Sequence, residues 1–340
     1  MNGLERKIFW EVLCSLEGED KEEDYAKLEK TIIYPNKLYR YRPVSIKTIE
    51  ALKNNKLYFS TANYYDDPFD TFINVRINEI RSELSKMKNT DASKLVNMAS
   101  TLANAFEVPA VNKATIQKMI SRIDDISGDV ENYFRNIRNE IKKDVYSVCF
   151  SESPFNEELW LKYAEQHKGF VAEYDLTNME KLICGKKEEC KYCGVNLYGS
   201  RLFPVYYSEN LYDATRFAQF LTVCSQMGIN LTADRFEKLK DLFGNQNWER
   251  EKISLIKNVC HSYDEEWRMI MSEPMNTNQP VMREWIPSAI YIGLRMKPSE
   301  VALISSIARA AGVEKIYKCI ISDDGKLAAI EITDRNQPSS

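Results

Sequence analysis

Histidine is scarce in this 340-residue chain, where His167 and His261 are the only two. No GxGxxG, GxxxxGK[ST], HExxH or GxSxG motif is present. These absences argue against Rossmann oxidoreductases, P-loop NTPases, zinc proteases and α/β-hydrolases. Two histidines also give Ser-His-Asp catalysis little support. No apolar run reaches the length of a membrane span, and residues 1–20 lack the apolar core of a signal peptide. We therefore expect a cytoplasmic protein without a membrane partner.

A large excess of charge of one sign is also absent, since the net charge is −4 and the pI is about 5.6. This balance argues against a broad electrostatic surface for nucleic acid but leaves room for a local basic groove. Hydrophobic residues make up 44% and charged residues 28%, as in ordinary globular proteins. A chain of this length buries a sizeable core without disulfides or metals.

The eight cysteines are expected to be mostly free thiols in a reducing compartment. Cys190 and Cys193 form a CxxC motif, with Cys184 shortly before it. A structural zinc usually takes four ligands, yet there is no second CxxC and both histidines lie far away in sequence. We favour a thiol-bearing turn over a zinc site formed by these three cysteines and a distant fourth ligand.

The pattern of apolar residues predicts an α+β fold with mixed, mainly antiparallel sheets and helical insertions. Residues 1–35 form a helical N-terminal extension in this interpretation, and residues 36–335 form a single domain with helical insertions at about 78–143 and 210–260. The last predicted element is a hairpin on a type I′ Asp-Gly turn. The other expected strands cover residues 56–60, 145–151, 170–176, 203–208, 265–272 and 289–294. A helix is expected over residues 299–311.

Residues 39–42 read Tyr-Arg-Tyr-Arg. On a strand the two tyrosines face one side and Arg40 and Arg42 face the other. In one interpretation the tyrosines lie in the core and the arginines are solvated or paired with nearby aspartates, which are Asp66, Asp67 and Asp70. In the other interpretation, an arginine binds a phosphate or a carboxylate through two N–H groups.

The aspartates after this strand surround Pro68. Asp67 must be extended because it precedes proline, and its carboxylate is suited to an Asx-type turn. We therefore expect Asp67 and Asp70 to be structural turn residues near the site. The cluster shows no metal-ligand spacing, but binding of a loosely held Mg²⁺ by several aspartates stays an open alternative.

A second charged segment runs from Asp264 to Arg268. On an extended chain Asp264, Glu266 and Arg268 share one face and Trp267 lies on the other. Two interpretations stay open: a Glu266–Arg268 charge ladder on a solvent face, or carboxylates in a cleft where one of them binds a ribose hydroxyl. Trp160 and Tyr163, one helical turn apart, are expected to pack in the core.

These motifs together resemble domain-of-unknown-function family 2971, a bacterial family without an assigned activity. The resemblance covers residues from about 36 to 333. This chain has His261 where the family usually has Trp, Asp264 where it has Glu, and Asp66 where Asn is common. The segments that carry the resemblance are Leu38–Arg42, Leu57–Ser60, Asp66–Asp70, Cys149–Ser151 with Trp160 and Tyr163, Gly169–Asp175 and Asp264–Arg268.

The order of motifs is also similar, more faintly, to the ADP-ribosyltransferase plan. That resemblance implies NAD as substrate and a setting in a toxin or in phage defence. Glu266 would be the catalytic carboxylate of an acid-x-Glu motif and would stabilise an oxocarbenium-like transition state. The NAD-binding residues that it implies are Arg40, Arg42, Tyr58, Ser60, Asp264 and Arg268.

The alternative is a non-catalytic regulatory module that binds a nucleotide or a protein segment in the same cleft. The acidic net charge and the aspartate at position 264 support this alternative. A metal-dependent nuclease is a third option, although no paired acidic ligands with a nearby lysine stand out. The acceptor of an ADP-ribose group, whether protein, nucleic acid or small molecule, is not predicted.

Overall fold

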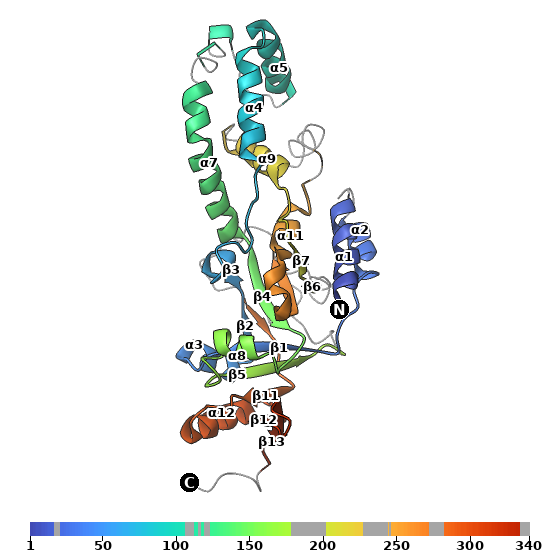
Figure 1. Ribbon diagram of the computed structural model, residues 1–340, viewed down its shortest axis with the longest axis vertical. Helices are drawn as coiled ribbons and strands as arrows, with labels where there is room; N and C mark the ends of the chain where they lie inside the picture. The colour runs from blue at the N-terminus through green and yellow to red at the C-terminus, as the bar shows by residue number, and fades with distance from the viewer. Residues whose placement is uncertain are drawn as a thin grey trace.

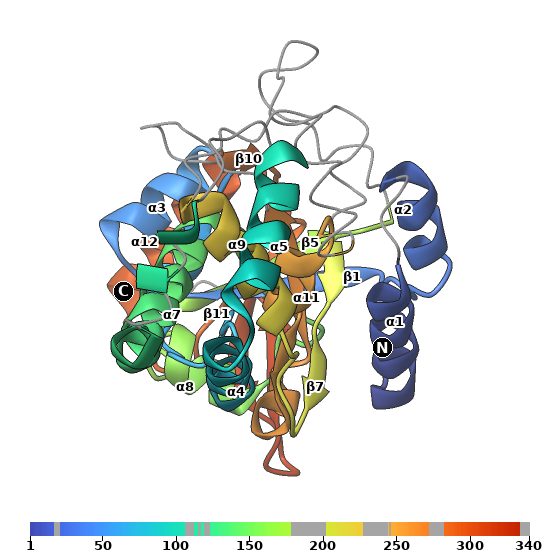
Figure 2. The ribbon, with the colours of Figure 1, turned by 90° about the horizontal axis from the view of Figure 1, so that it is seen from above.

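A mixed sheet of nine strands forms the centre of the fold in a computed structural model of the chain (Figures 1 and 2). The strand order is β13-β12-β11-β5-β1-β4-β9-β6, with β3 paired to β4. Strands β11 and β12 run parallel, whereas the other pairs of this sheet are antiparallel. The predicted α+β class with a mainly antiparallel sheet is confirmed. The structure describes residues 1–16, 21–105, 112–114, 117–118, 123–177, 202–226, 244, 246–271 and 282–333.

Two further pairs of strands lie outside the main sheet: β2 pairs with β10, and β7 pairs with β8. The strands are β1 (Lys37–Arg42), β2 (Lys56–Tyr58), β3 (Ser60–Thr61), β4 (Tyr146–Ser151), β5 (Phe170–Asp175), β6 (Leu202–Pro204), β7 (Tyr206–Ser208), β8 (Ile256–Asn258), β9 (Glu266–Met271), β10 (Met282–Glu284), β11 (Ala289–Ile292), β12 (Lys315–Ile321) and β13 (Leu327–Glu331).

Helices extend from both ends of the sheet. Helices α4, α5 and α7 project from one end, and α12 lies with β11, β12 and β13 at the other (Figure 1). Seen from above, α1 and α2 lie on the side opposite α3 and α12 (Figure 2). The described helices are α1 (Gly3–Ser15), α2 (Lys21–Glu29), α3 (Ile46–Lys53), η1 (Ala62–Tyr64), α4 (Ile77–Lys88), α5 (Ala92–Ala105), α7 (Ile123–Asp144), α8 (Glu157–Tyr163), α9 (Thr215–Gln226), α11 (Glu249–Ser254), η5 (Val259–Asp264) and α12 (Pro298–Ala310). None of them is long and apolar enough to cross a bilayer.

Strand β1 alternates as its sequence predicts. Tyr39 and Tyr41 pack in a cluster with Trp160 and Tyr291. On the opposite face Leu38 belongs to the larger core cluster. Arg40 and Arg42 share the face of Leu38, because side chains two residues apart in a strand point the same way. The alternation therefore places two guanidinium groups beside an apolar core.

The sheet splits between β1 and β4. β1 pairs with β5 at six positions, and β4 pairs with β9 at six positions. Between β1 and β4, however, Tyr39 opposite Ser151 is the one paired position. Near the far end of β4, Ser60 of β3 pairs with Ser147 instead. The two halves of the sheet therefore diverge from Tyr39 onward.

Three details of the predicted fold are wrong. Residues 56–60 form two strands in different sheets, because the chain leaves β10 after Tyr58, buries Phe59 and joins β4 at Ser60. Residues 203–208 divide in the same way between β9 and β8. In the final hairpin Gly325 has a positive φ but Asp324 does not, so the turn is not type I′.

Gly169 sits where the chain enters β5, tightly against two backbone segments. Its N–H donates to the carbonyl oxygen of Ala164 at 2.8 Å. A Cβ atom at this position would lie 2.2 Å from the carbonyl oxygen of Arg42 and 2.9 Å from two backbone atoms of Ala164. Glycine here fixes the distance between β1, which carries Arg42, and the end of α8.

Substituting Gly169 with alanine should therefore destabilise the fold. The added methyl group forces backbone apart, and such overpacking costs about 1–3 kcal/mol. Urea unfolding followed by circular dichroism measures the loss. Gly3→Ala is the control, because nothing lies within 4 Å of the added Cβ there. Equal stability of the two variants would contradict the tight contact.

Candidate functional site

A cavity of about 280 Å³ lies in the split between β1 and β4. One arm of the split contributes Arg40 and Arg42, and the other contributes Ser147, Cys149 and Ser151. The remaining lining comes from β1, β3 and the turns after it, β4, α8, β8, η5 and β9. These residues are Tyr39, Tyr41, Ser60, Tyr64, Tyr65, Asp66, Asp67, Asp70, Phe150, Leu159, Tyr163, Lys257, His261, Asp264, Glu266 and Arg268.

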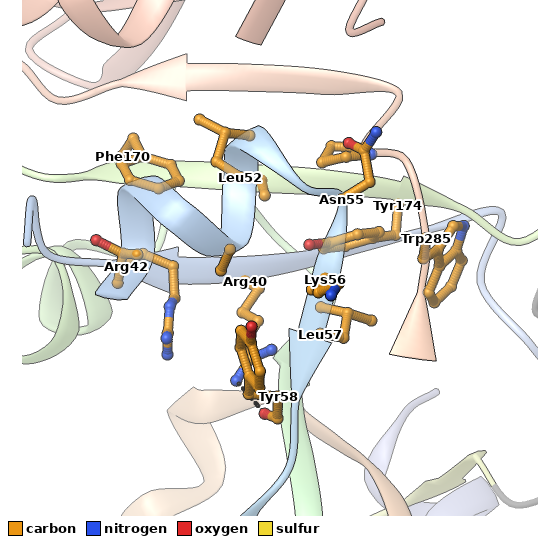
Figure 3. Close-up of a pocket in the computed structure, with 14 residues that line it drawn as sticks. Arg40, Arg42, Leu52, Asn55, Lys56, Leu57, Tyr58, Phe170, Tyr174 and Trp285 are labelled. Atoms are coloured by element: carbon orange, nitrogen blue, oxygen red, sulfur yellow. Dashed lines mark hydrogen bonds between the residues drawn. The ribbon is translucent and has the colours of Figure 1, made fainter. Parts of the chain in front are cut away.

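The arginine arm of the cavity carries two positive charges. Within the described residues neither Arg40 nor Arg42 has a carboxylate within ion-pair distance, although Arg40 Nη2 donates to the carbonyl oxygen of Tyr58 at 3.3 Å. The two guanidinium groups point to the same side of β1 (Figure 3). The charge of Arg40, together with burial, lowers the pKa of Arg42 to about 9. Two half-buried like charges of this kind favour binding of an anion.

The opposite side of the cavity is a buried ion network centred on Arg268, of which only 1% is exposed. Its Nη1 and Nη2 donate to the two carboxylate oxygens of Asp70 at 2.7 and 2.5 Å. Nε donates to Glu266 Oε1 at 2.7 Å, and Nη1 also donates to the carbonyl oxygen of Ser254 at 2.6 Å. Since four of its five N–H donors are used, Arg268 fixes the relative positions of β9, the end of α11 and the Asp70 turn.

Glu266 is held between two cations and is 6% exposed. Its Oε1 accepts from Arg268, and its Oε2 accepts from Lys257 Nζ at 2.9 Å. Burial alone would raise the pKa of Glu266, but Arg268 and Lys257 outweigh it and hold that pKa below its ordinary value. Glu266 is therefore an ionised carboxylate at the edge of the cavity.

Asp264 has a different environment from Glu266 although the two are neighbours. Its Oδ2 accepts from Lys257 Nζ at 2.9 Å, and His261 Nδ1 lies 4.0 Å from the same oxygen. Burial raises the pKa of Asp264 against the opposing charge of Lys257, and the charge of Glu266 adds to the rise. His261 Nε2 lies 3.3 Å from Asp67 Oδ2, so the imidazole bridges two carboxylates at the cavity wall.

The serines and the cysteine of the cavity are neutral. Tyr65 and Ser147 share a hydrogen bond, and Ser147 Oγ lies 3.5 Å from the Cys149 sulfur. Burial and the charge of Glu266 raise the pKa of Cys149 to about 12. Cys149 is therefore a thiol at neutral pH, which argues against nucleophilic catalysis by this residue.

Most of the predicted site residues meet in this cavity. Arg40, Arg42, Ser60, Asp67, Asp70, Asp264, Glu266 and Arg268 all line it. Tyr58 does not: it lines an adjoining cavity of about 30 Å³ beneath α3, which Arg40 and Arg42 also line together with Tyr174 and Trp285 (Figure 3). Cys184, Cys190 and Cys193 lie outside the described residues. Among the residues that are described, no three His, Cys, Asp or Glu side chains are placed to hold a metal ion.

The tyrosines of β1 lie in the core, as one interpretation of the sequence expected, but two specific expectations about charge pairing are wrong. Asp67 and Asp70 do not neutralise the arginines of β1, because Asp70 pairs with Arg268 and Asp67 faces His261. The Glu266–Arg268 pair exists but is buried, so it is not a ladder on a solvent face. The Asx-type turn is confirmed, since Asp67 Oδ1 accepts from the Phe69 N–H at 2.8 Å.

The acid-x-Glu segment also differs from its predicted form. β9 begins at Glu266, whereas Asp264 ends the 3-10 helix η5. Glu265 between them has a left-handed backbone with φ 44°. Asp264 therefore approaches the cavity from a turn rather than from the strand face, and simple alternation could not place it.

Several residues of the cavity were not predicted from the sequence, and Lys257 and Tyr163 are two of them. Lys257 was not considered, although a lysine between the apolar residues Ile256 and Val259 is a signal for a buried partner. Tyr163 was expected in the core, and that expectation is wrong because 39% of it is exposed. Helix α8 ends at Tyr163, so the ring lies beyond the face on which Trp160 is fully buried.

No sequence profile of a known family, no curated protein and no solved structure matches this chain. The resemblances to family 2971 and to ADP-ribosyltransferases therefore stay predictions. The functional argument depends on the geometry of the cavity.

Replacing Arg268 with methionine should destabilise the protein by about 3–5 kcal/mol, because Asp70 and Glu266 would be left buried without their main partner. Chemical denaturation at pH 7 gives the free energy of unfolding. Arg76→Met is the matched control, since Arg76 forms an exposed ion pair with Glu79 and its loss should cost much less. If both variants lose the same stability, the network does not support the fold.

The lowered pKa of Glu266 predicts a specific response to acid. A carboxylate whose pKa is lower in the folded chain stabilises it fully above its unfolded value, near 4.5, and loses that contribution as the pH falls towards the folded value. Glu266→Gln should therefore be less stable at pH 7 but lose less stability between pH 5 and 3 (about the range of carboxylate titration).

Urea unfolding at several pH values measures this difference in slope. Glu79→Gln on the exposed surface of α4 is the control. A slope for Glu266→Gln that equals that of the wild type would show that the ion network does not depend on ionised Glu266.

Proposed function

We propose that this chain is an NAD-consuming enzyme of the ADP-ribosyltransferase type. In the proposed reaction the bond between nicotinamide nitrogen and ribose C1′ breaks, and its electron pair returns to the pyridine ring. Water or an acceptor nucleophile then bonds to C1′ and releases a proton. The products are nicotinamide and either ADP-ribose or an ADP-ribosylated acceptor.

One observation carries the proposal: Arg40, Ser60 and Glu266 line the same cavity. They come from β1, β3 and β9, and more than 200 residues separate Ser60 from Glu266. A basic group, a hydroxyl and a carboxylate are the three parts that the resemblance requires in one place. A buried network that served only stability would not need two arginines that have no carboxylate partner among the described residues.

The arginine pair suits the pyrophosphate of NAD. Guanidinium groups bind phosphate oxygens through paired N–H donors, and Arg40 and Arg42 bring two of them to one wall of the cavity. Ligand sites commonly measure about 300–1,000 Å³. A cavity of about 280 Å³ would take the reacting ribose end and leave the adenosine at the mouth, where Tyr64 is 80% exposed.

The acidic side of the cavity suits the transition state. As the glycosidic bond breaks, positive charge develops on the ribose ring, and a fixed carboxylate in a water-poor site stabilises it. Glu266 is ionised and cannot reorient, because Arg268 and Lys257 hold both of its oxygens. Its charge is thus present before the reaction begins.

The same contacts favour a second candidate, a non-catalytic module that binds a nucleotide. Each Glu266 oxygen already has a cationic partner at 2.7 or 2.9 Å. A carboxylate neutralised in this way contributes less to a developing positive charge. In that case the arginine pair would still bind phosphate, and no bond would break.

Purified protein incubated with NAD should release nicotinamide, measured by chromatography, or transfer labelled ADP-ribose to a macromolecule. Glu266→Gln should reduce the rate about 100-fold or more, as the loss of one preorganised electrostatic group does in other enzymes. The control is Glu50→Gln on the exposed surface of α3, which should retain the wild-type rate.

Binding of NAD without release or transfer would overturn the enzyme and leave the binding module. Absence of both binding and turnover would contradict both candidates. Wild-type activity in Glu266→Gln would show that the reaction does not use the acidic side of the cavity.

A further inference from the structure

Asp264 brings to the cavity an oxygen that the protein leaves without a hydrogen bond. Its Oδ1 is buried and has no partner among the described residues, and only 5% of Asp264 is exposed. A buried acceptor without a donor costs free energy, and such atoms in native structures call for a specific explanation. A donor from outside the chain would supply it.

The other carboxylates of the ion network are already occupied. Asp70 accepts from Arg268 with both oxygens, and Glu266 accepts from Arg268 and Lys257. Asp264 accepts from Lys257 with Oδ2 alone. Of these three carboxylates, Asp264 is therefore the one with an oxygen that has no hydrogen-bond partner among the described residues.

The end of η5 gives Asp264 this separate role. Asn258 caps the helix by accepting from the Cys260 N–H, and the Glu265 N–H donates to the Ser262 carbonyl oxygen. The left-handed backbone at Glu265 then turns the chain into β9. As a result Asp264 reaches Lys257 from a different direction than Glu266 does, and Lys257 contacts one oxygen of each.

The two walls of the cavity require different groups from one ligand. Arg40 and Arg42 are cationic and call for an anion, whereas Asp264 Oδ1 calls for a hydroxyl or an N–H donor. An inorganic anion satisfies the first wall only. A nucleoside phosphate satisfies both, because its ribose hydroxyls are donors at a short distance from its phosphate.

We propose that Asp264, rather than Glu266, accepts the hydrogen bond from a ribose hydroxyl of the bound nucleotide. The proposal rests on the nucleotide ligand of the proposed function and assigns the contact within it. Glu266 acts on the ligand through its charge, and Asp264 through direct contact. Aspartate at this position then suits the proposed contact: Oδ2 accepts from Lys257, and Oδ1 would accept from the ribose hydroxyl.

Calorimetric titration with ADP-ribose and with inorganic pyrophosphate tests this assignment. Asp264→Asn and Asp264→Ala should bind ADP-ribose about tenfold or more weakly, the usual effect of losing a hydrogen bond to a charged group. Their affinity for pyrophosphate should stay within about twofold of the wild type or increase, since the arginine pair is intact. The matched control is Asp24→Asn, a buried aspartate bonded to Trp248 far from the cavity.

A merely structural role predicts another pattern. If Asp264 only supports Lys257, its variants lose affinity for both ligands alike, and the assignment is overturned. Equal affinity of the wild type for ADP-ribose and pyrophosphate overturns it as well, and so does selective loss of ADP-ribose binding in Glu266→Gln with normal binding in Asp264→Asn. Thermal unfolding of each variant confirms that it is folded.

Failure of this assignment is distinct from failure of the proposed function. If the wild type releases nicotinamide from NAD while Asp264→Asn binds ADP-ribose normally, only the assignment falls. If the wild type binds ADP-ribose through Asp264 but releases no nicotinamide, the assignment stands and the site is a binding module.

Discussion

The bidentate pair between Arg268 and Asp70 is the interaction on which the rest of the site depends. It joins β9 to the turn after β3 across nearly two hundred residues of chain, with both partners buried. Because a buried charge without its partner is very costly, the two elements cannot separate while the protein is folded. Glu266 and, through it, Lys257 and Asp264 take their positions from this pair.

The split between β1 and β4 opens the cavity beside the Arg268–Asp70 pair. If β1 continued along β4, the side chains of Arg40 and Arg42 would lie above a continuous surface. Because the strands share one paired position, a cavity opens between them. The positive wall then belongs to one half of the sheet and the acidic network to the other, so the chemistry of the site follows directly from the topology.

The sequence predicted well what depends on local alternation and poorly what depends on distant partners. The two faces of β1, the Asx-type turn at Asp67 and the end of α12 at Gly312 follow from neighbouring residues, and the structure confirms them. The exposure of Tyr163 could not be predicted, because it depends on where α8 ends. Lys257 lies in a segment whose apolar neighbours signal burial, but its position opposite the distant Asp70 turn could not be predicted. Asp264 was predicted as a site residue, but which of its oxygens lacks a hydrogen bond depends on the position of Lys257.

The order of these segments along the chain affects when the cavity forms during synthesis and folding. Residues 40–70 are synthesised early, whereas Lys257, Asp264 and Arg268 emerge late. Contacts between such distant segments form slowly and near the end of folding. A nascent or truncated chain thus contains Arg40 and Arg42 but lacks the acidic side of the cavity. The cavity is therefore complete only after the segment that carries Lys257, Asp264 and Arg268 has joined the sheet.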